Sequence, residues 1–274
     1  MKKAGLLLSC LAGLLILSGC LPQKKVQGPT PVGGELPSKE VGPTPISSQE
    51  VALEGRPYVT LTPRSDGKEI TLSLSGIVGA KSLEYELVYF AGEPRNQLQR
   101  GVVGAVDLQG KTDYTKSLLL GTCSRNVCKY DENVTEGTLS LTFRKESGET
   151  QKYQSIFHLQ RGKEGKEGLT SGDGNFQFVS QSLPSSGFYL TCSTVGLFQM
   201  PAGKVVGGPY GIFTAGSSKV TGQVTLKLQN PSKNAKIMLW DGKKWNELET
   251  TVSSDGLSVS ATTGQLGTFV VIEE

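Results

Sequence analysis

Short runs of alternating hydrophobic and polar residues recur along the chain from residue 58 onward. A period of two places successive side chains on opposite faces of a strand, so these runs predict strands with one buried and one solvated face. Gly, Pro, Asn and Asp separate the runs and favour turns. No long amphipathic helical pattern occurs, so the sequence predicts an all-β protein. The clearest hydrophobic sets are Ile70, Leu72 and Leu74; Leu83, Tyr85, Leu87 and Tyr89; Leu139, Leu141 and Phe143; and Tyr153, Phe157 and Leu159.

Residues 53–162 are predicted to form the first of two β-sandwich-like domains. About six or seven short strands in roughly 100 residues suit the two packed sheets of an immunoglobulin-like sandwich. This assignment rests on the strand pattern, because the Cys…Trp…Cys spacing of antibody domains is missing. The next stretch, 163–175, contains Gly-Lys-Glu triplets without proline. Such a short run cannot sustain a collagen-type triple helix, so it is predicted to be a solvated linker.

Residues 176–274 are predicted to form a second β domain that ends in a β-meander. Ala235–Trp240 is expected to pair with Trp245–Val252, because Asp241-Gly242 supplies the positive φ angles that a tight hairpin turn needs. Thr268–Ile272 provides the last strand of the meander. These closing hairpins are similar to those of β-sandwich modules in large bacterial surface proteins.

The N-terminus follows a different pattern. Lys2 and Lys3 precede an apolar run from Ala4 to Leu17, which is shorter than the roughly 20 residues needed to span a bilayer. A charged end followed by an apolar run is the order of a secretory signal peptide. The run ends in Leu17-Ser18-Gly19-Cys20, where small residues precede a cysteine. This ending resembles the signal, or lipobox, of bacterial lipoproteins.

The resemblance to bacterial lipoproteins implies that residues 1–19 are a signal peptide and that Cys20 becomes the lipidated N-terminus. It implies a diacylglyceryl thioether on Cys20, often with a further amide-linked chain such as palmitate. Two or more acyl chains anchor a protein durably to a lipid bilayer. The mature chain is then extracytoplasmic, on the cell surface or in the periplasm. Leu21 stands where an Asp would retain such a protein in the inner membrane of some Gram-negative bacteria.

Residues 20–52 are predicted to be a disordered tether between the lipid and the folded part. They are rich in Pro, Gly, Ser and charged residues, a composition that cannot build a core. Gly28-Pro29-Thr30-Pro31 recurs as Gly42-Pro43-Thr44-Pro45, and such prolines stiffen a chain toward extended polyproline geometry. The tether is expected to hold the folded domains away from the membrane.

Cys123 and Cys128 are predicted to form a disulfide. An exported chain meets an oxidising environment, and these two cysteines are close enough in sequence to close a short hairpin or loop. A redox-active pair or half of a metal site are the alternatives. Redox pairs usually have two intervening residues, whereas four separate these cysteines, and no second Cys or His pair stands nearby to complete a zinc site.

Cys192 lies in an apolar, strand-like stretch and is predicted to be a buried, inert thiol. His158 is the only histidine of the chain, so a Cys192–His158 nucleophile is the alternative. The two residues fall on opposite sides of the expected linker, and no catalytic motif surrounds either. No metal and no cofactor other than the covalent lipid is expected.

Charge and motif content argue against several classes of function. The 28 basic and 25 acidic residues are nearly balanced once Lys2 and Lys3 leave with the signal, so no nucleic acid partner is expected. Gly104–Thr112 nearly spells a phosphate-binding loop, but five residues separate its glycines where the motif needs four. No His-Glu-x-x-His and no Gly-x-Ser-x-Gly motif occurs, and no enzyme activity is predicted.

Together these observations predict a non-catalytic binding, adhesion or structural module at the cell envelope. Its candidate partners are a cell-wall polymer or another envelope protein. Trp240 and Trp245 flank a hairpin turn and are candidate ligand contacts, although either could instead fill the core. Two alternatives stay open. An envelope hydrolase would need a cleft with converging polar groups, and the substrate-binding lipoprotein of a transporter would need alternating strands and helices.

Overall fold

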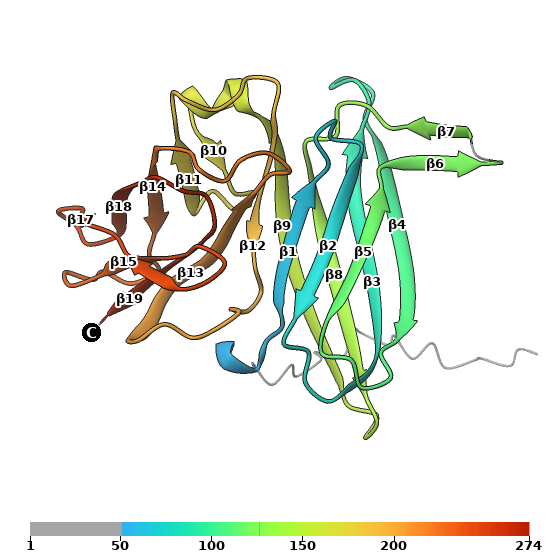
Figure 1. Cartoon of the computed structure of the whole chain (residues 1–274), viewed down its shortest axis with the longest axis horizontal. Helices are drawn as coiled ribbons and strands as arrows, with labels where there is room; N and C mark the ends of the chain where they lie inside the picture. Colours follow the sequence, from blue (N-terminus) through green and yellow to red (C-terminus); the bar gives the residue numbers. More distant parts are fainter. Residues whose placement is uncertain (1–50, 126, 274) are drawn as a thin grey trace, which may run out of the picture. The chain divides into compact units, whose positions relative to one another are not determined.

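The computed structural model describes residues 51–125 and 127–273, and this part of the chain is all-β (Figure 1). Its helices are two short 3-10 turns, η1 (Leu53–Gly55) and η2 (Gly162–Lys166), and neither could cross a membrane. The strands are β1 (Tyr58–Pro63), β2 (Glu69–Ser75), β3 (Ala80–Ala91), β4 (Leu98–Asp107), β5 (Tyr114–Leu119), β6 (Gly121–Ser124), β7 (Val127–Tyr130), β8 (Glu136–Lys145), β9 (Thr150–Arg161), β10 (Leu169–Thr170), β11 (Phe176–Val179), β12 (Phe188–Ser193), β13 (Lys204–Phe213), β14 (Gly222–Lys227), β15 (Lys236–Trp240), β16 (Trp245–Glu247), β17 (Thr250–Val252), β18 (Ser258–Thr263) and β19 (Thr268–Glu273).

The predicted alternation of buried and solvated side chains is confirmed. In β2, every second residue is fully buried, from Ile70 through Leu72 to Leu74. In β3, Leu83 and Leu87 are fully buried while Glu84 between them faces solvent. The hydrophobic pattern therefore sets which face of each strand turns inward, as a sheet covered on one side requires.

Two sandwiches result, each with its own hydrophobic core. In the first, the three-stranded sheet β1-β2-β5 packs on strands β9, β8 and β3, and leucines such as Leu72 and Leu139 meet between them. In the second, the five-stranded sheet β10-β11-β14-β18-β17 packs on β15, β19 and β13, with Phe178 and Phe269 in the core. Both arrangements match the predicted β-sandwich class.

One sheet runs through both sandwiches. Its nine strands follow the order β16-β15-β19-β13-β12-β9-β8-β3-β4, so β9 of the first predicted domain pairs with β12 of the second (Figure 1). Leu190, Cys192 and Val195 follow the expected linker in sequence, yet they belong to the first core. The two modules thus keep separate cores but share a sheet.

The prediction that residues 163–175 are a solvated linker is wrong. They contain most of η2, strand β10 and the turn into β11, and Leu169 is fully buried in the second core. The adjoining glycine, Gly162, is buried and donates its N–H to the carbonyl of Gly187 at 2.9 Å. A glycine-rich sequence suggests a flexible segment, but here the small residues allow neighbouring backbone segments to pack closely.

The predicted meander at the C-terminus is also wrong in its connectivity. The hairpin β15–β16 forms, with Trp240 opposite Trp245. The chain then leaves this sheet, and β17 pairs with β18 in the five-stranded sheet, while β19 returns beside β15. Thr250 holds the chain where it passes from one sheet to the other. Its hydroxyl accepts a hydrogen bond from the N–H of Ile237 at 2.8 Å and donates one to the carbonyl of Leu248 at 2.8 Å. The predicted signal peptide, Cys20 and the predicted tether as far as residue 50 lie outside the described residues.

Replacing Gly162 by alanine tests whether the chain is closely packed where β9 enters this stretch. An added Cβ would collide with the carbonyl oxygen of Pro184, which only backbone movement can relieve. We expect Gly162→Ala to lower the free energy of unfolding by about 1–3 kcal/mol in urea titrations. Gly264→Ala is the control, because its Cβ would meet no atom within 4 Å. Equal unfolding midpoints for the two variants and the parent would contradict the packed arrangement.

Candidate ligand-binding site

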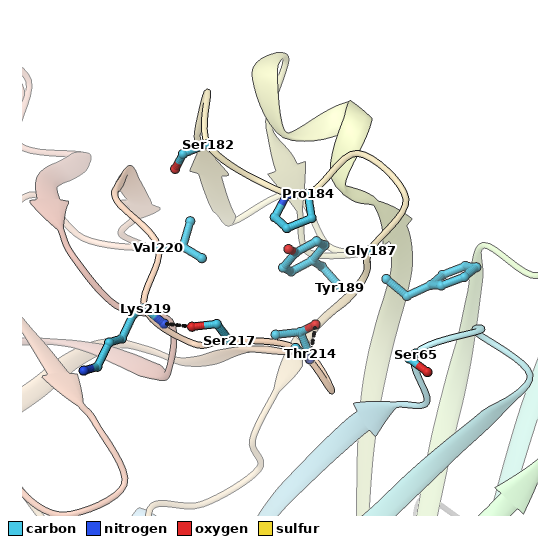
Figure 2. Close-up of a pocket in the computed structure, with 11 residues that line it drawn as sticks. Ser65, Ser182, Pro184, Gly187, Tyr189, Thr214, Ser217, Lys219 and Val220 are labelled. Carbon is cyan, nitrogen blue, oxygen red and sulfur yellow. Dashed lines mark hydrogen bonds between the residues drawn. The ribbon is translucent and has the colours of Figure 1, made fainter.

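A cavity of about 260 Å³ opens where the two sandwiches meet. Figure 2 shows its walls, which come from the loop between β11 and β12, the loop between β13 and β14, and the turn between β1 and β2. The β9–β12 ladder places these three loops together. The lining residues are Ser65, Ser182, Pro184, Gly187, Phe188, Tyr189, Thr214, Gly216, Ser217, Lys219 and Val220.

Two aromatic rings at the start of β12 form part of the wall. The ring of Phe188 lies under the guanidinium of Arg161, 3.8 Å from the ring centroid, and packs against Gly67 of the β1–β2 turn. A cation over a ring face is attracted by the ring quadrupole, which holds Phe188 in place. These contacts tie the turn of the first sandwich to the first residue of β12.

Tyr189 contributes a buried ring with an unpartnered hydroxyl. The residue is 3 % exposed, and burial raises the pKa of its phenol. Among the described residues no hydrogen bond to this hydroxyl is formed, yet the oxygen is not sealed from solvent. A phenol can both donate and accept a hydrogen bond. The hydroxyl is therefore available to a ligand that enters the cavity.

Threonine and serine hydroxyls line the opposite wall. Thr214 accepts the N–H of Gly216 at 3.1 Å, and Ser217 accepts the N–H of Lys219 at 3.1 Å, as the dashed lines in Figure 2 mark. These bonds fix the loop and leave each hydroxyl hydrogen free to donate. The side chain of Lys219 extends away from Tyr189 and Pro184 (Figure 2).

This arrangement suits a small, hydroxyl-bearing group. The cavity lies below the range of about 300–1,000 Å³ that is usual for whole drug-sized ligands, so it fits one unit of a larger molecule. The described lining offers hydroxyls beside ring faces, and it contains no carboxylate, histidine or thiol. The lining therefore has serine, threonine and tyrosine hydroxyls and the lysine Lys219, but no histidine or carboxylate beside them.

The predicted disulfide is confirmed. Cys123 and Cys128 are bonded across the hairpin of β6 and β7, where they are directly opposite each other. Both cysteines are exposed, and Val127 beside the bond is 74 % exposed. At the base of the hairpin, the Asp131 carboxylate accepts a hydrogen bond from the Tyr89 hydroxyl at 2.8 Å and another from the Arg100 guanidinium at 3.2 Å. The disulfide therefore closes a surface hairpin rather than joining parts of a core.

The two tryptophans have different surroundings. Trp240 is 5 % exposed and stacks on Phe198 at 5.4 Å, so it fills the core, one of the two outcomes that the sequence allowed. Trp245 is half-buried, and its indole N–H donates to the carbonyl of Gln199 at 2.9 Å. Its role as a ligand contact stays a prediction. The aromatic ring most open to solvent in this cluster is Phe198, 58 % exposed, which the sequence analysis missed.

Cys192 is fully buried, as predicted, and burial raises the pKa of its thiol to about 12. On the neighbouring strand β9, His158 is opposite Thr191 and Phe157 is opposite Cys192. Successive residues of a strand point to opposite faces, so the thiol and the imidazole are on different sides of the sheet. His158 instead contacts the carbonyl of Thr170 through Nδ1 at 3.0 Å. The two do not form a nucleophile–base pair.

No sequence motif marks the cavity. Its hydroxyls come from loops whose Ser and Gly content predicts only turns, and its rings come from a strand that reads as core. No protein-family model matches the chain, and a search of curated proteins also finds no match. The site is therefore defined by its geometry alone.

Proposed function

We propose that the protein is a lipoprotein anchored outside the cytoplasm through Cys20, and that it serves as a non-catalytic binding module at the cell envelope. The observation that carries this proposal is the N-terminal pattern of Lys2 and Lys3, an apolar run and Leu17-Ser18-Gly19-Cys20. A signal of this kind addresses a chain to a membrane surface and leaves it without a spanning helix.

The folded part supports a binding role. The described residues form two sandwiches on one shared sheet, with loops meeting at a cavity of about 260 Å³. Rigid sheets that position loops are a common scaffold for recognition. Two short 3-10 helices in the described part do not fit the alternating strands and helices of two-lobed transporter proteins.

The chemistry of the cavity favours a saccharide unit of a cell-wall polymer as the ligand. The unpartnered phenol of Tyr189 and the donor hydrogens of Thr214 and Ser217 match a ligand rich in hydroxyls. Pro184 and Val220 supply apolar surface beside them, as a sugar ring requires on its less polar face (Figure 2). A cavity too small for a whole oligomer still accommodates one unit of it.

Labelling with a palmitate analogue in the producing bacterium tests the anchor. We expect the wild-type chain to incorporate the label and to sediment with membranes, and Cys20→Ser to lose both, because the thioether needs the Cys20 sulfur. Cys10→Ser is the matched control, since Cys10 lies within the predicted signal and is expected to label like the parent. A Cys20→Ser chain that still carries label would overturn the anchor assignment.

Retention of the full, detergent-solubilised chain on purified insoluble cell wall tests the ligand class. Tyr189→Phe removes one hydroxyl, and we expect roughly two- to tenfold weaker retention, the effect of one hydrogen bond of about 0.5–1.5 kcal/mol. Tyr153→Phe is the matched control, because the Tyr153 hydroxyl is buried without a partner, away from the cavity lining. Equal retention of the two variants, or no retention of the parent, would contradict a saccharide ligand in this cavity.

A further inference from the structure

Four aromatic rings form a continuous cluster on the surface of the protein. The ring centroid of Phe198 is 6.0 Å from that of Tyr58 and 5.4 Å from that of Trp240, and Trp240 is 5.5 Å from Trp245. Trp240 is buried, and Tyr58 and Trp245 are half-buried. Phe198 is the exposed ring of the four. An exposed ring backed by packed rings differs from a scattered surface side chain and suggests a contact surface.

The described chain begins beside this aromatic cluster. Leu53 and Met200 pack on the same small core as Trp245, and both are half-buried. Tyr58 forms an isolated β-bridge with Val195, which holds the entering segment against the loop that carries Phe198. The segment that leads back to Cys20 therefore joins the folded part at this apolar surface.

We propose that the occupant of this surface is the lipid bilayer to which Cys20 is attached, with the Phe198 ring inserted at the bilayer interface. The inference rests on the proposed lipid anchor. It adds to the anchor a direct contact between the folded part and the membrane, and hence an orientation.

The place where the chain enters favours the bilayer as the occupant. Residues 21–50, about 30 residues, separate Cys20 from the described part. A flexible coil of this length has a root-mean-square length of roughly 30 Å. A linker of this kind gives an effective concentration on the order of millimolar, so even a weak contact would be populated. The length of the predicted tether thus permits contact with the membrane as well as separation from it.

The chemistry of the aromatic cluster also suits a bilayer interface. Aromatic rings are enriched at the level of the lipid headgroups. The indole N–H of Trp245 donates to the carbonyl of Gln199 at 2.9 Å, and the Tyr58 hydroxyl is bonded to the Thr268 hydroxyl at 2.8 Å. Lipid that covers these two rings would therefore leave neither polar group without a partner. One exposed ring is too small an area for a stable protein–protein interface, but the tether makes a small contact sufficient.

This docking would direct the cavity away from the membrane. Strand β1 begins at Tyr58, in the aromatic cluster, and ends at the turn whose Ser65 lines the cavity. Figure 1 shows η1 and this turn at opposite ends of β1. A bilayer at the Phe198 surface would leave the cavity open to the cell wall, where the proposed saccharide ligand is found. Membrane contact and ligand binding would then not compete.

Quenching of tryptophan emission in liposomes tests the docking on the lipidated full chain. The two tryptophans of the chain both belong to the aromatic cluster, so the emission reports on this surface. The chain is purified in detergent from the producing bacterium and reconstituted into phosphatidylethanolamine–phosphatidylglycerol liposomes, with or without bromine on the acyl chains. Bromine quenches an indole only at short range. We expect lower emission in the brominated liposomes than in the ordinary ones.

Two variants make the result specific to the exposed ring. Phe198→Ser should remove most of the difference in emission between the two kinds of liposome. Val103→Ser is the matched control, because Val103 is 71 % exposed on β4, outside the aromatic cluster, and its loss should leave the difference unchanged.

Flotation of the same liposomes separates a failure of the anchor from a failure of the docking. A chain that does not float with the liposomes overturns the anchor and the docking with it. A chain that floats but has equal emission in both kinds of liposome overturns the docking alone and leaves the cluster to another occupant, such as a second copy. The proposal is also overturned if Phe198→Ser is quenched as strongly as the parent.

Discussion

The antiparallel ladder between β9 and β12 is the constraint on which the rest of the structure depends. Five residue pairs, from Phe188 opposite Arg161 to Cys192 opposite Phe157, join the two sandwiches in one sheet. Both faces of β12 are buried: Leu190 and Cys192 enter the first core, and Tyr189 enters the second. A strand shared in this way makes the packing of each sandwich depend on the other.

The cavity is a consequence of this shared strand. Since β12 begins at the junction, its first two residues, Phe188 and Tyr189, lie between loops of different sandwiches. Arg161, the last residue of β9, covers the Phe188 ring and fixes it from the neighbouring strand. The polar wall comes from turns in which Thr214 and Ser217 bond to their own backbone. The site therefore needs the ladder for its shape and the turns for its polarity.

The sequence predicted the local features and missed the non-local ones. Alternation located β2, β3, β8 and β9 because each has one solvated face, and the spacing of Cys123 and Cys128 predicted their disulfide. The shared sheet left no such signal, because β12 is buried on both faces and reads only as an apolar run. Gly165 lies in the stretch predicted to be a solvated linker, although it is buried and a Cβ there would meet Leu183. The cavity combines loops far apart in sequence, which no local pattern encodes.

Native-state hydrogen exchange of the β12 amides tests the central claim most directly. If β12 belongs to both sandwiches, the Leu190 and Thr191 amides should exchange only through the same global opening as the core strands β8 and β19. All of these amides should then report one free energy of opening and one dependence on denaturant. Separate free energies for β8 and β19, with β12 following only one of them, would contradict a single cooperative sheet.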